Sequence, residues 1–254
     1  MIEIKNIHKG FGGEEILKGI DFVFETGVTN LIIGQSGSGK SVLLKTMLGL
    51  FKPEEGSIEY DGKAYSTFTD EEQRELRTEV GMLFQGGALF DSMTVEENVM
   101  FPLRMFTQQR KSEMKSRVTE VLKRVNLEGN EKKYPSEISG GMQKRVAIAR
   151  AIVNKPKYLF CDEPNSGLDP TTATVIDKLI QELTVENNIT TVVITHDMNS
   201  VLEIGENIAF LKDGLLAWKG DKSQIFQTDD ETVTDFVYSS NLFKKVRDAQ
   251  LKGH

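Results

Sequence analysis

A glycine-rich segment at residues 34–41 constrains the fold of this chain more than any other feature. It reads Gly34-Gln35-Ser36-Gly37-Ser38-Gly39-Lys40-Ser41 and matches the G-x-x-x-x-G-K-S pattern of a phosphate-binding loop. The apolar run Leu31-Ile32-Ile33 precedes it, and residues 42–48 after it read as a helix. Strand, loop and helix in this order are the context that the pattern requires, so the sequence predicts an α/β fold that binds a nucleotide.

The residue types in this loop suit a triphosphate. Glycines let successive backbone N–H groups turn toward phosphate oxygens, and the following helix adds the positive end of its dipole. We expect Lys40 to reach the β- and γ-phosphates and the Ser41 hydroxyl to bind Mg²⁺. The predicted ATP-binding residues of the loop are Gly34, Gln35, Ser36, Gly37, Ser38, Gly39, Lys40, Ser41 and Val42.

Length and charge limit the class of protein. A chain of 254 residues suits one large α/β domain or a core domain with an inserted subdomain. No apolar run approaches the roughly 20 residues of a membrane-spanning helix, and the N-terminus lacks a signal-peptide pattern, so we expect a cytosolic protein. The net charge of −7 argues against nucleic-acid binding. The single cysteine, Cys161, lies in an apolar run and is expected to be an inert core residue.

Charged side chains follow two apolar runs that read as buried parallel strands. Asp162 and Glu163 come after residues 158–161, and His196 comes after residues 190–195. Because ligand sites lie at the carboxyl ends of such strands, we expect Asp162 to bind Mg²⁺ and Glu163 to orient or deprotonate an attacking water. His196 could hydrogen-bond a phosphate or the water. The alternatives are a solvated pair of carboxylates and a histidine satisfied in the core.

Two further features are ambiguous by themselves. Phe11 lies in a glycine-rich turn between alternating strands of residues 1–28, where it either stacks on a nucleotide base or folds onto the core. Ser139-Gly140-Gly141 opens a helix whose bare N-terminus could bind a second anion, although an ordinary capped helix explains this stretch alone equally simply.

Taken together and in order, these motifs resemble those of the nucleotide-binding subunit of an ATP-binding cassette (ABC) transporter. The resemblance covers about residues 1–220 and departs in the signature, where Met142 stands in place of the usual glutamine. The matched segments are the A-loop aromatic Phe11, the Walker A residues 34–41, the Q-loop Gln85, the signature Ser139-Gly140-Gly141, the Walker B end Asp162-Glu163, the D-loop residues 166–169 with Asp169, and the switch His196.

The resemblance implies a P-loop NTPase (RecA-like) core with an antiparallel β subdomain and an inserted helical subdomain. The expected core is residues 1–85 and 155–220, the expected helical signature subdomain is 86–154, and 221–254 is a partly helical tail. It also implies ATP hydrolysis with Glu163, His196, Gln85 and Lys40 as catalytic residues, and Mg²⁺ held by Ser41, Gln85 and Asp162. Ser139, Gly140, Gly141 and Asp169 would contact ATP.

The same resemblance implies partners. Two subunits would pack head to tail around two ATP molecules, and the homodimer would drive an integral membrane permease from the cytoplasmic face of the inner membrane. Residues 84–95 look like those of Mla-type ATPases, which serve phospholipid transport alongside MCE-family lipid-binding proteins. The alternative is that 86–95 is only a permease-docking loop, as in the ATPase of a small-solute importer such as an amino-acid importer.

Two other classes fit less well. A soluble ABC ATPase that acts on DNA or ribosomes usually has coiled-coil inserts or two cassettes in one chain. A P-loop kinase for small molecules would not carry the Ser139-Gly140-Gly141 signature.

Overall fold

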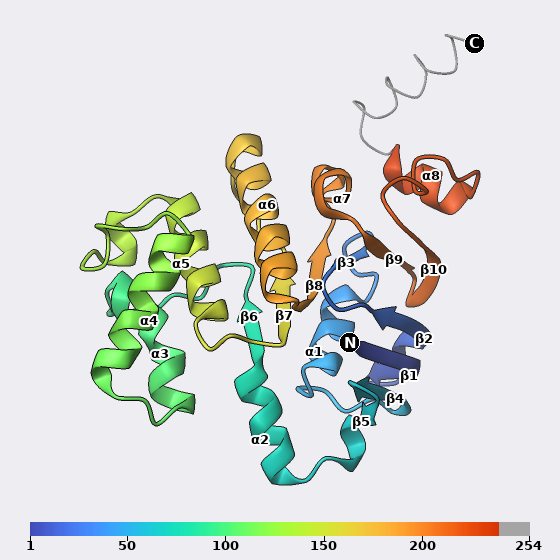
Figure 1. Cartoon of the computed structure of the whole chain (residues 1–254). Coiled ribbons are helices and arrows are strands. Elements are labelled where there is room, and N and C mark those ends of the chain that lie inside the picture. Colours follow the sequence, from blue (N-terminus) through green and yellow to red (C-terminus); the bar gives the residue numbers. More distant parts are fainter. Residues whose placement is uncertain (239–254) are drawn as a thin grey trace.

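The computed structural model describes residues 1–238 and contains two β-sheets (Figure 1). The smaller sheet is antiparallel, in the order β2-β1-β4-β5, and its strands are β1 (Ile2–Phe11), β2 (Glu14–Phe24), β4 (Glu55–Tyr60) and β5 (Lys63–Ala64). Alternating buried and exposed residues along β2 explain why this sheet is half-buried. The sequence predicted that Phe11 lies in a glycine-rich turn, but β1 continues to Phe11 and only Gly12 and Gly13 form the turn.

The larger sheet has the order β10-β9-β3-β8-β7-β6 and is parallel except for its β9–β10 hairpin. Its strands β3, β7 and β8 are buried on both faces, as continuous apolar runs require. They are β3 (Thr29–Ile33), β6 (Val80–Leu83), β7 (Tyr158–Asp162), β8 (Thr190–Thr195), β9 (Asn207–Lys212) and β10 (Leu215–Gly220).

The two faces of the larger sheet pack on different partners. Ile32, Phe160 and Ile194 face α1 (Lys40–Met47) and the antiparallel sheet, while Leu31, Leu159 and Val193 belong to the second hydrophobic core. That core includes residues of α5 (Gly140–Ile152), α6 (Pro170–Asn187) and α7 (Met198–Ile204). The P-loop NTPase architecture predicted from the sequence is thus present, with an antiparallel sheet beside the core.

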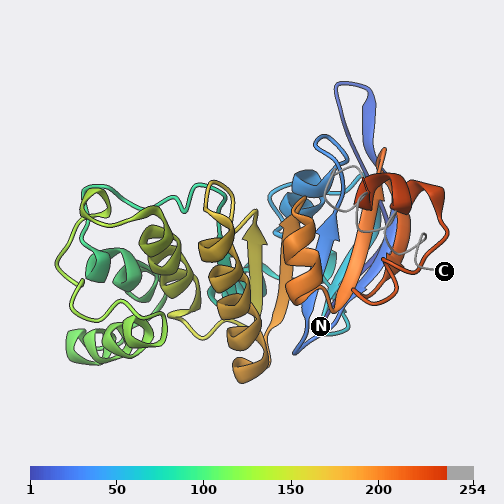
Figure 2. The ribbon, with the colours of Figure 1, turned by 90° about the horizontal axis from the view of Figure 1, so that it is seen from above.

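Residues 86–154 contain helices and, in the structure, no strand. These are α3 (Val95–Phe106), α4 (Lys111–Arg124), the 3₁₀ turn η2 (Pro135–Glu137) and α5. They form a separate group at one side of the sheets in two perpendicular views (Figures 1 and 2). We therefore propose 86–154 as the helical subdomain. Before it, the 3₁₀ turn η1 (Tyr65–Thr67) and α2 (Asp70–Glu79) lead into β6.

The last helix of the described residues, α8 (Glu231–Val237), packs on the larger sheet, where the ring centroids of Phe236 and Phe210 lie 4.9 Å apart. The part of the predicted, partly helical tail beyond residue 238 lies outside the described residues. Within residues 1–238 the structure contains no helix with the length and apolar character needed to cross a bilayer.

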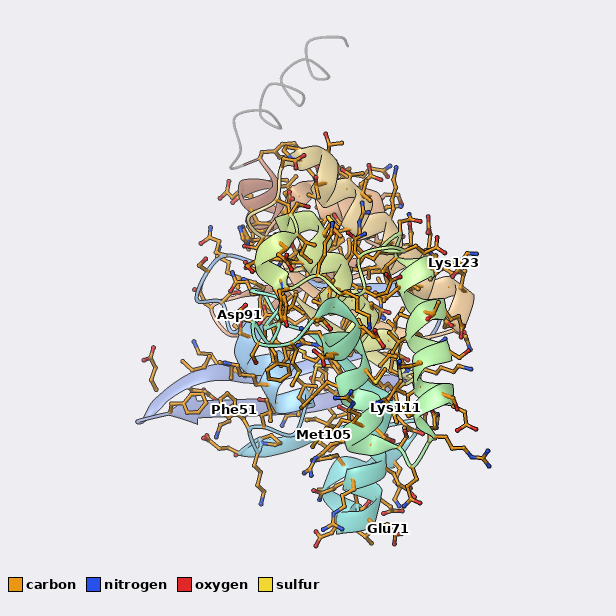
Figure 3. The ribbon with its side chains drawn as sticks, turned by 90° about the vertical axis from the view of Figure 1, so that its left-hand side faces the viewer. Phe51, Glu71, Asp91, Met105, Lys111 and Lys123 are labelled. Atoms are coloured by element: carbon orange, nitrogen blue, oxygen red, sulfur yellow. The ribbon has the colours of Figure 1, made fainter. Side chains whose placement is uncertain are left out.

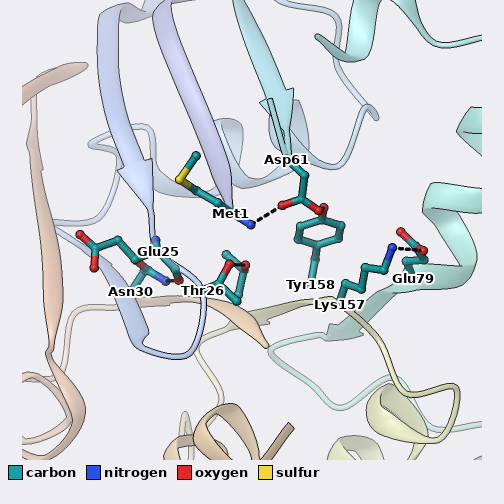
Figure 4. A network of polar contacts seen from close by, with 9 residues as sticks. Met1, Glu25, Thr26, Asn30, Asp61, Glu79, Lys157 and Tyr158 are labelled. Carbon is teal, nitrogen blue, oxygen red and sulfur yellow. Dashed lines mark hydrogen bonds and ion pairs between the residues drawn. The ribbon is translucent and has the colours of Figure 1, made fainter. Parts of the chain in front are cut away.

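A polar cluster joins the N-terminus to both sheets (Figure 4). The Met1 ammonium lies 2.6 Å from Oδ1 of Asp61, in the turn between β4 and β5. The Tyr158 hydroxyl, at the start of β7, donates to Oδ2 of the same carboxylate at 2.6 Å. Asp61 therefore connects the first strand of one sheet to a central strand of the other.

Candidate functional site

The phosphate loop lies between β3 and α1, where the sequence placed it. Gly39 occupies the N-cap of α1 with φ 100°, and a Cβ there would approach Leu17 Cδ2 to 2.8 Å, so the position requires glycine. No side chain caps this helix. Its first N–H groups are therefore available to an anion.

Lys40 lies within the loop. Its Nζ donates to the carbonyl oxygens of Gly34 and Gln35, both at 2.8 Å. Burial lowers the pKa of Lys40, while the charges of Glu163 and Asp162 raise it. The ammonium thus lies in a partly desolvated site, where it interacts more strongly with a phosphate than it would in water.

A pocket of about 480 Å³ opens beside the loop. It brings together the β1 residue Phe11, the loop, and both strand-end carboxylates. Its lining is Phe11, Ile16, Ser36, Gly37, Gly39, Lys40, Ser41, Val42, Asp162, Glu163 and Ile194. Three of the residues predicted within 34–42 are not in this lining: Gly34 and Gln35 hold Lys40, and the Ser38 side chain is buried.

Phe11 lies at the edge of this pocket and is 46% exposed. Its ring meets Phe51 edge-on at 5.1 Å, and Lys9 Nζ lies 5.0 Å from its centroid. The ring is thus not folded into the core, which was one of its two predicted settings. A half-exposed aromatic beside a phosphate loop is suitably placed to stack on a base.

Glu163 has an unusual backbone and two side-chain partners. It follows β7 with φ 45°, a left-handed conformation that is uncommon for a non-glycine residue, and its N–H donates to Ile194 O at 2.9 Å. Gln85 Nε2 donates to Oε2 at 2.8 Å, and His196 Nδ1 lies 2.9 Å from Oε1. Three residues predicted to be catalytic, from separate parts of the chain, therefore meet at one carboxylate.

The tautomer of His196 follows from this contact. An ionised carboxylate can only accept hydrogen bonds, so Nδ1 carries the proton. A neutral ring then presents Nε2 as an acceptor, suited to a water molecule. Donation to a phosphate oxygen would require the charged ring.

Asp162 and Ser41 offer oxygen ligands in the same pocket as Lys40. Burial and the neighbouring Glu163 raise the pKa of Asp162, and Lys45, Lys40 and Lys144 lower it. In residues 1–238 no three His, Cys, Asp or Glu side chains cluster as a metal site. One carboxylate and one hydroxyl fit Mg²⁺ bound together with phosphates, because Mg²⁺ usually keeps few protein ligands there. Gln85, also predicted as a ligand, instead lies beside Glu163 and does not line this pocket.

Two buried cations of α5 hold the backbone of the segment after β6. Lys144 Nζ donates to the Gln85 carbonyl. Arg150 donates to the carbonyls of Gly87 at 2.6 Å and Ala88 at 2.7 Å. Neither residue was predicted from the sequence, although a cation on a helix face shared with Val146 and Ala147 was an available signal.

A second pocket, of about 350 Å³, lies at the N-terminus of α5. Ser139 caps this helix by accepting from Met142 N at 3.3 Å. A Cβ on Gly141 would lie 2.7 Å from Thr172 Cγ2, so glycine permits the approach of α5 to α6. The lining is Ser139, Gly140, Gly141, Met142, Arg145, Gly167, Leu168, Asp169 and Thr172. Arg145, which the sequence analysis did not identify, adds a positive charge beside the helix end.

Asp169 belongs to this second pocket and not to the phosphate-loop pocket. It caps α6, where Oδ1 accepts from Thr172 N at 3.0 Å and Oδ2 from Thr172 Oγ1 at 2.6 Å. These hydrogen bonds, the side-chain one first, lower the pKa of Asp169. The chain therefore contains one pocket with the phosphate loop and a separate pocket with the Ser-Gly-Gly segment, and they share no lining residue.

Comparison with known proteins gives consistent matches. A family model described as "ABC transporter" matches residues 17–166. The chain is 39% identical over 236 residues to the probable ribonucleotide transport ATP-binding protein mkl of Mycobacterium leprae, with 93% of this chain and 68% of that protein covered. It is 42% identical over 226 residues to the methionine import ATP-binding protein MetN of Clostridium tetani, with 89% of this chain and 71% of that protein covered. The chain thus spans roughly two thirds of the length of these curated relatives.

Solved structures match as well. A dimeric bacterial ABC transporter cassette superposes with a TM-score of 0.78 at 36% identity, covering 87% of this chain and 99% of that one. The cbiO1 protein of Clostridium perfringens, described as part of an ABC transporter complex, superposes with a TM-score of 0.84 at 30% identity, covering 97% of this chain and 98% of that one.

Proposed function

The chain belongs to the ABC transporter family as one of its ATP-hydrolysing cassettes, and we propose that two copies drive a permease that imports a small solute. ATP would bind between the two copies, with the phosphate loop of one facing the Ser139 pocket of the other. Closure of the dimer on ATP moves the permease, and hydrolysis reopens the dimer.

The separation of the two anion sites carries this proposal. One chain presents a phosphate loop with the proposed catalytic carboxylate and, in a different pocket, the N-terminus of α5 with its cap Ser139 and Gly140. Neither pocket contains the residues of the other. In this proposal an ATP molecule that contacts both sets of residues therefore has to lie between two chains. A head-to-tail pair of identical chains supplies both, and the similar cassette that is dimeric supports this arrangement.

The roles of the residues follow from their positions. Glu163 accepts a proton from the attacking water. Its carboxylate is held in place by Gln85 at Oε2 and by His196 at Oε1. Lys40 and the first N–H groups of α1 stabilise negative charge on the phosphates. Ser41 and Asp162 would hold Mg²⁺, which neutralises phosphate charge when bound with ATP. Phe11 stacks on the base.

The face toward the permease is proposed to include the 86–110 region. Phe90, Met105 and Phe106 are exposed large apolar side chains of this region. Figure 3 shows Met105 and Asp91 on the same side of the molecule, at the surface of α3 and of the loop before it. Exposed apolar side chains of this kind are common at protein interfaces.

The choice of a small solute rests on the names of relatives. One is called a methionine import ATP-binding protein and another a probable ribonucleotide transport ATP-binding protein. The phospholipid role expected from residues 84–95, with an MCE-type partner, receives no support from these relatives. The importer alternative fits them better, with an amino acid or a nucleotide as candidate cargo.

Purification of the complex from native membranes tests the proposal. The tagged chain is solubilised in mild detergent, and its partners and bound lipids are identified by mass spectrometry. A multi-span permease with a solute-binding protein would support import, and reconstituted vesicles should then couple uptake of labelled methionine or nucleotide to ATP hydrolysis. An MCE-domain protein with bound phospholipid would replace the importer proposal. Recovery only with ribosomes or DNA would overturn the transporter role.

A further inference from the structure

A buried polar triad lies next to the Glu163–His196 pair. Its members are Asn165, Asp177 and Ser200, with exposures of 7%, 1% and 1%. Asp177 is on the face of α6 that also presents Ala173, Ile176 and Ile180 to the core. A carboxylate on this face is costly unless it has hydrogen-bond partners.

Three hydrogen bonds link the triad. Asn165 Nδ2 donates to Asp177 Oδ2 at 3.2 Å and to Ser200 Oγ at 2.7 Å. Ser200 Oγ donates to the same Asp177 Oδ2 at 2.8 Å. Asp177 Oδ1 is buried and has no hydrogen-bond partner among the described residues. Both donors thus converge on a single carboxylate oxygen.

The triad joins the two segments that carry the proposed catalytic pair. Asn165 is two residues after Glu163, in the loop between β7 and α6. Ser200 is four residues after His196, in α7, which packs against α6. Asn165, Glu163 and His196 also line one cavity of about 410 Å³. The segments therefore meet twice, through the exposed Glu163–His196 contact and through the buried triad.

We propose that Asp177 is a positioning residue for ATP hydrolysis, which fixes the Glu163 segment against the His196 segment through Asn165 and Ser200. The inference depends on the roles proposed above for Glu163 and His196. Loss of the Asp177 acceptor lets the two segments move relative to each other. The His196 ring then no longer aligns the Glu163 carboxylate, although ATP still binds to the phosphate loop.

The energetics favour positioning over stability as the role. Apolar residues of similar volume often replace a whole buried polar network without loss of stability, whereas removal of one partner leaves the others unsatisfied. The pKa of Asp177 is raised to about 6, chiefly by burial and also by the charges of Asp197 and Glu203, while the hydrogen bonds from Ser200 and Asn165 oppose this rise. Cys161 of β7 is the other titratable neighbour, and its own pKa is raised by burial and by Asp177. The ionised carboxylate thus costs stability but is the stronger acceptor for both donors.

The test compares wild type, Asp177→Asn and Asp177→Leu as full chains. We measure kcat, the KM for ATP and Tm at pH 8, then repeat kcat at pH 5. The amide variant keeps one acceptor oxygen, so we expect its kcat to fall about tenfold. The leucine variant keeps none, and we expect its kcat to fall up to about a hundredfold. Small displacements in a catalytic site have effects of this size. We expect KM for ATP to stay within about twofold, since the triad does not line the ATP pocket. We expect Tm at pH 8 not to fall for Asp177→Asn.

The pH dependence separates positioning from a merely structural role. At pH 5 most of the wild-type Asp177 side chains are protonated and neutral, as the amide is at every pH. The ratio of wild-type to Asp177→Asn kcat should therefore shrink between pH 8 and pH 5. A constant ratio, or a loss of kcat that tracks loss of Tm, would overturn the proposal.

Two controls keep the result interpretable. Asp229→Asn makes the same chemical change at an exposed site and should match wild type. Glu163→Gln reports on the proposed catalytic base. If this variant hydrolyses ATP normally, the proposed function fails. If it is inactive while Asp177→Asn has a normal kcat, only the positioning role of Asp177 is overturned. If Asp177→Leu does not fold, Ser200→Ala removes one donor and should still lower kcat with unchanged KM.

Discussion

Gln85 Nε2 donates a hydrogen bond to Glu163 Oε2 at 2.8 Å, across 78 residues of chain. The contact joins the start of the segment after β6 to the residue after β7. The Gln85 carbonyl is in turn held by the buried Lys144 of α5. The proposed catalytic carboxylate is thereby connected to α5, the helix that Ser139 caps, through one side chain and one backbone group.

Glu163→Gln should retain ATP binding and lose turnover. The amide keeps the size of the side chain but cannot take a proton from water, and removal of a general base costs roughly 10²- to 10⁴-fold in rate. Steady-state phosphate release measures the loss. Size-exclusion chromatography with ATP should show a persistent dimer, because the bound nucleotide is not consumed. Phosphate release near the wild-type rate would rule out Glu163 as the base.

Lys144→Met should lower kcat by about tenfold without changing ATP affinity. Methionine fills similar space, but the Gln85 carbonyl loses its donor and the Gln85 amide is no longer fixed against Glu163. A fluorescent ATP analogue reports affinity, and phosphate release reports kcat. Lys123→Met, at an exposed position of α4, is the matched control. Equal activity in both variants would show that the Gln85 backbone needs no anchor.

The strand-end motifs could be predicted from the sequence because their chemistry is local. An apolar run followed by Asp162-Glu163 predicts a buried strand, and it predicts that the two carboxylates lie at the carboxyl end of that strand. His196 was predicted in the same way, from its position after the apolar run of β8, and its Nδ1 lies 2.9 Å from Glu163 Oε1. The phosphate loop was equally local, since its glycines and Lys40 are consecutive.

The buried network could not be predicted in the same way. Asn165, Asp177 and Ser200 are separated by 12 and 23 residues along the chain, and their proximity depends on how α6 and α7 pack. The available signal was one carboxylate on the apolar face of a helix, at Asp177. The partners of Gln85 were missed for the same reason, because the contact between α5 and the segment after β6 is tertiary.

Phe11→Ala should raise the KM for ATP about tenfold and leave kcat within about twofold. Stacking of a base on an aromatic ring contributes roughly 1–3 kcal/mol, and Phe11 is half-exposed, which favours the lower part of that range. Phe11→Tyr keeps the ring and is the control. An unchanged KM in the alanine variant would mean that the base binds elsewhere.

Tyr158→Phe should lower stability at neutral pH by about 1 kcal/mol, since the ring remains packed but Asp61 loses a hydrogen bond. Burial raises the pKa of Asp61, but hydrogen bonds from the N-terminal ammonium and the Tyr158 hydroxyl outweigh it and leave the pKa below its usual value. A depressed pKa stabilises the fold above the unfolded-state pKa, and this contribution is lost as the pH falls through the folded-state value. The difference in Tm between wild type and Tyr158→Phe should thus be present at pH 7 and shrink below about pH 4. A difference independent of pH would contradict this.

Asp177→Asn should make the protein more stable at pH 8 even though it lowers kcat. Burial raises the folded-state pKa of Asp177 from 3.8 to about 6, which corresponds to roughly 3 kcal/mol between the two protonation states. Because the pKa is raised, the stability that this carboxyl contributes is present below the unfolded-state pKa and is lost as the pH rises through about 6. The asparagine does not ionise and avoids that loss, although its amide N–H groups replace Oδ1 without a partner and reduce the gain to about 1–2 kcal/mol. Thermal unfolding at pH 5 and pH 8 should show the Tm of the variant rising relative to wild type with pH, while Asp229→Asn stays parallel to wild type. If Tm of the variant fell relative to wild type between pH 5 and pH 8, Asp177 would be stabilising as a charge, and its effect on kcat would need no separate explanation.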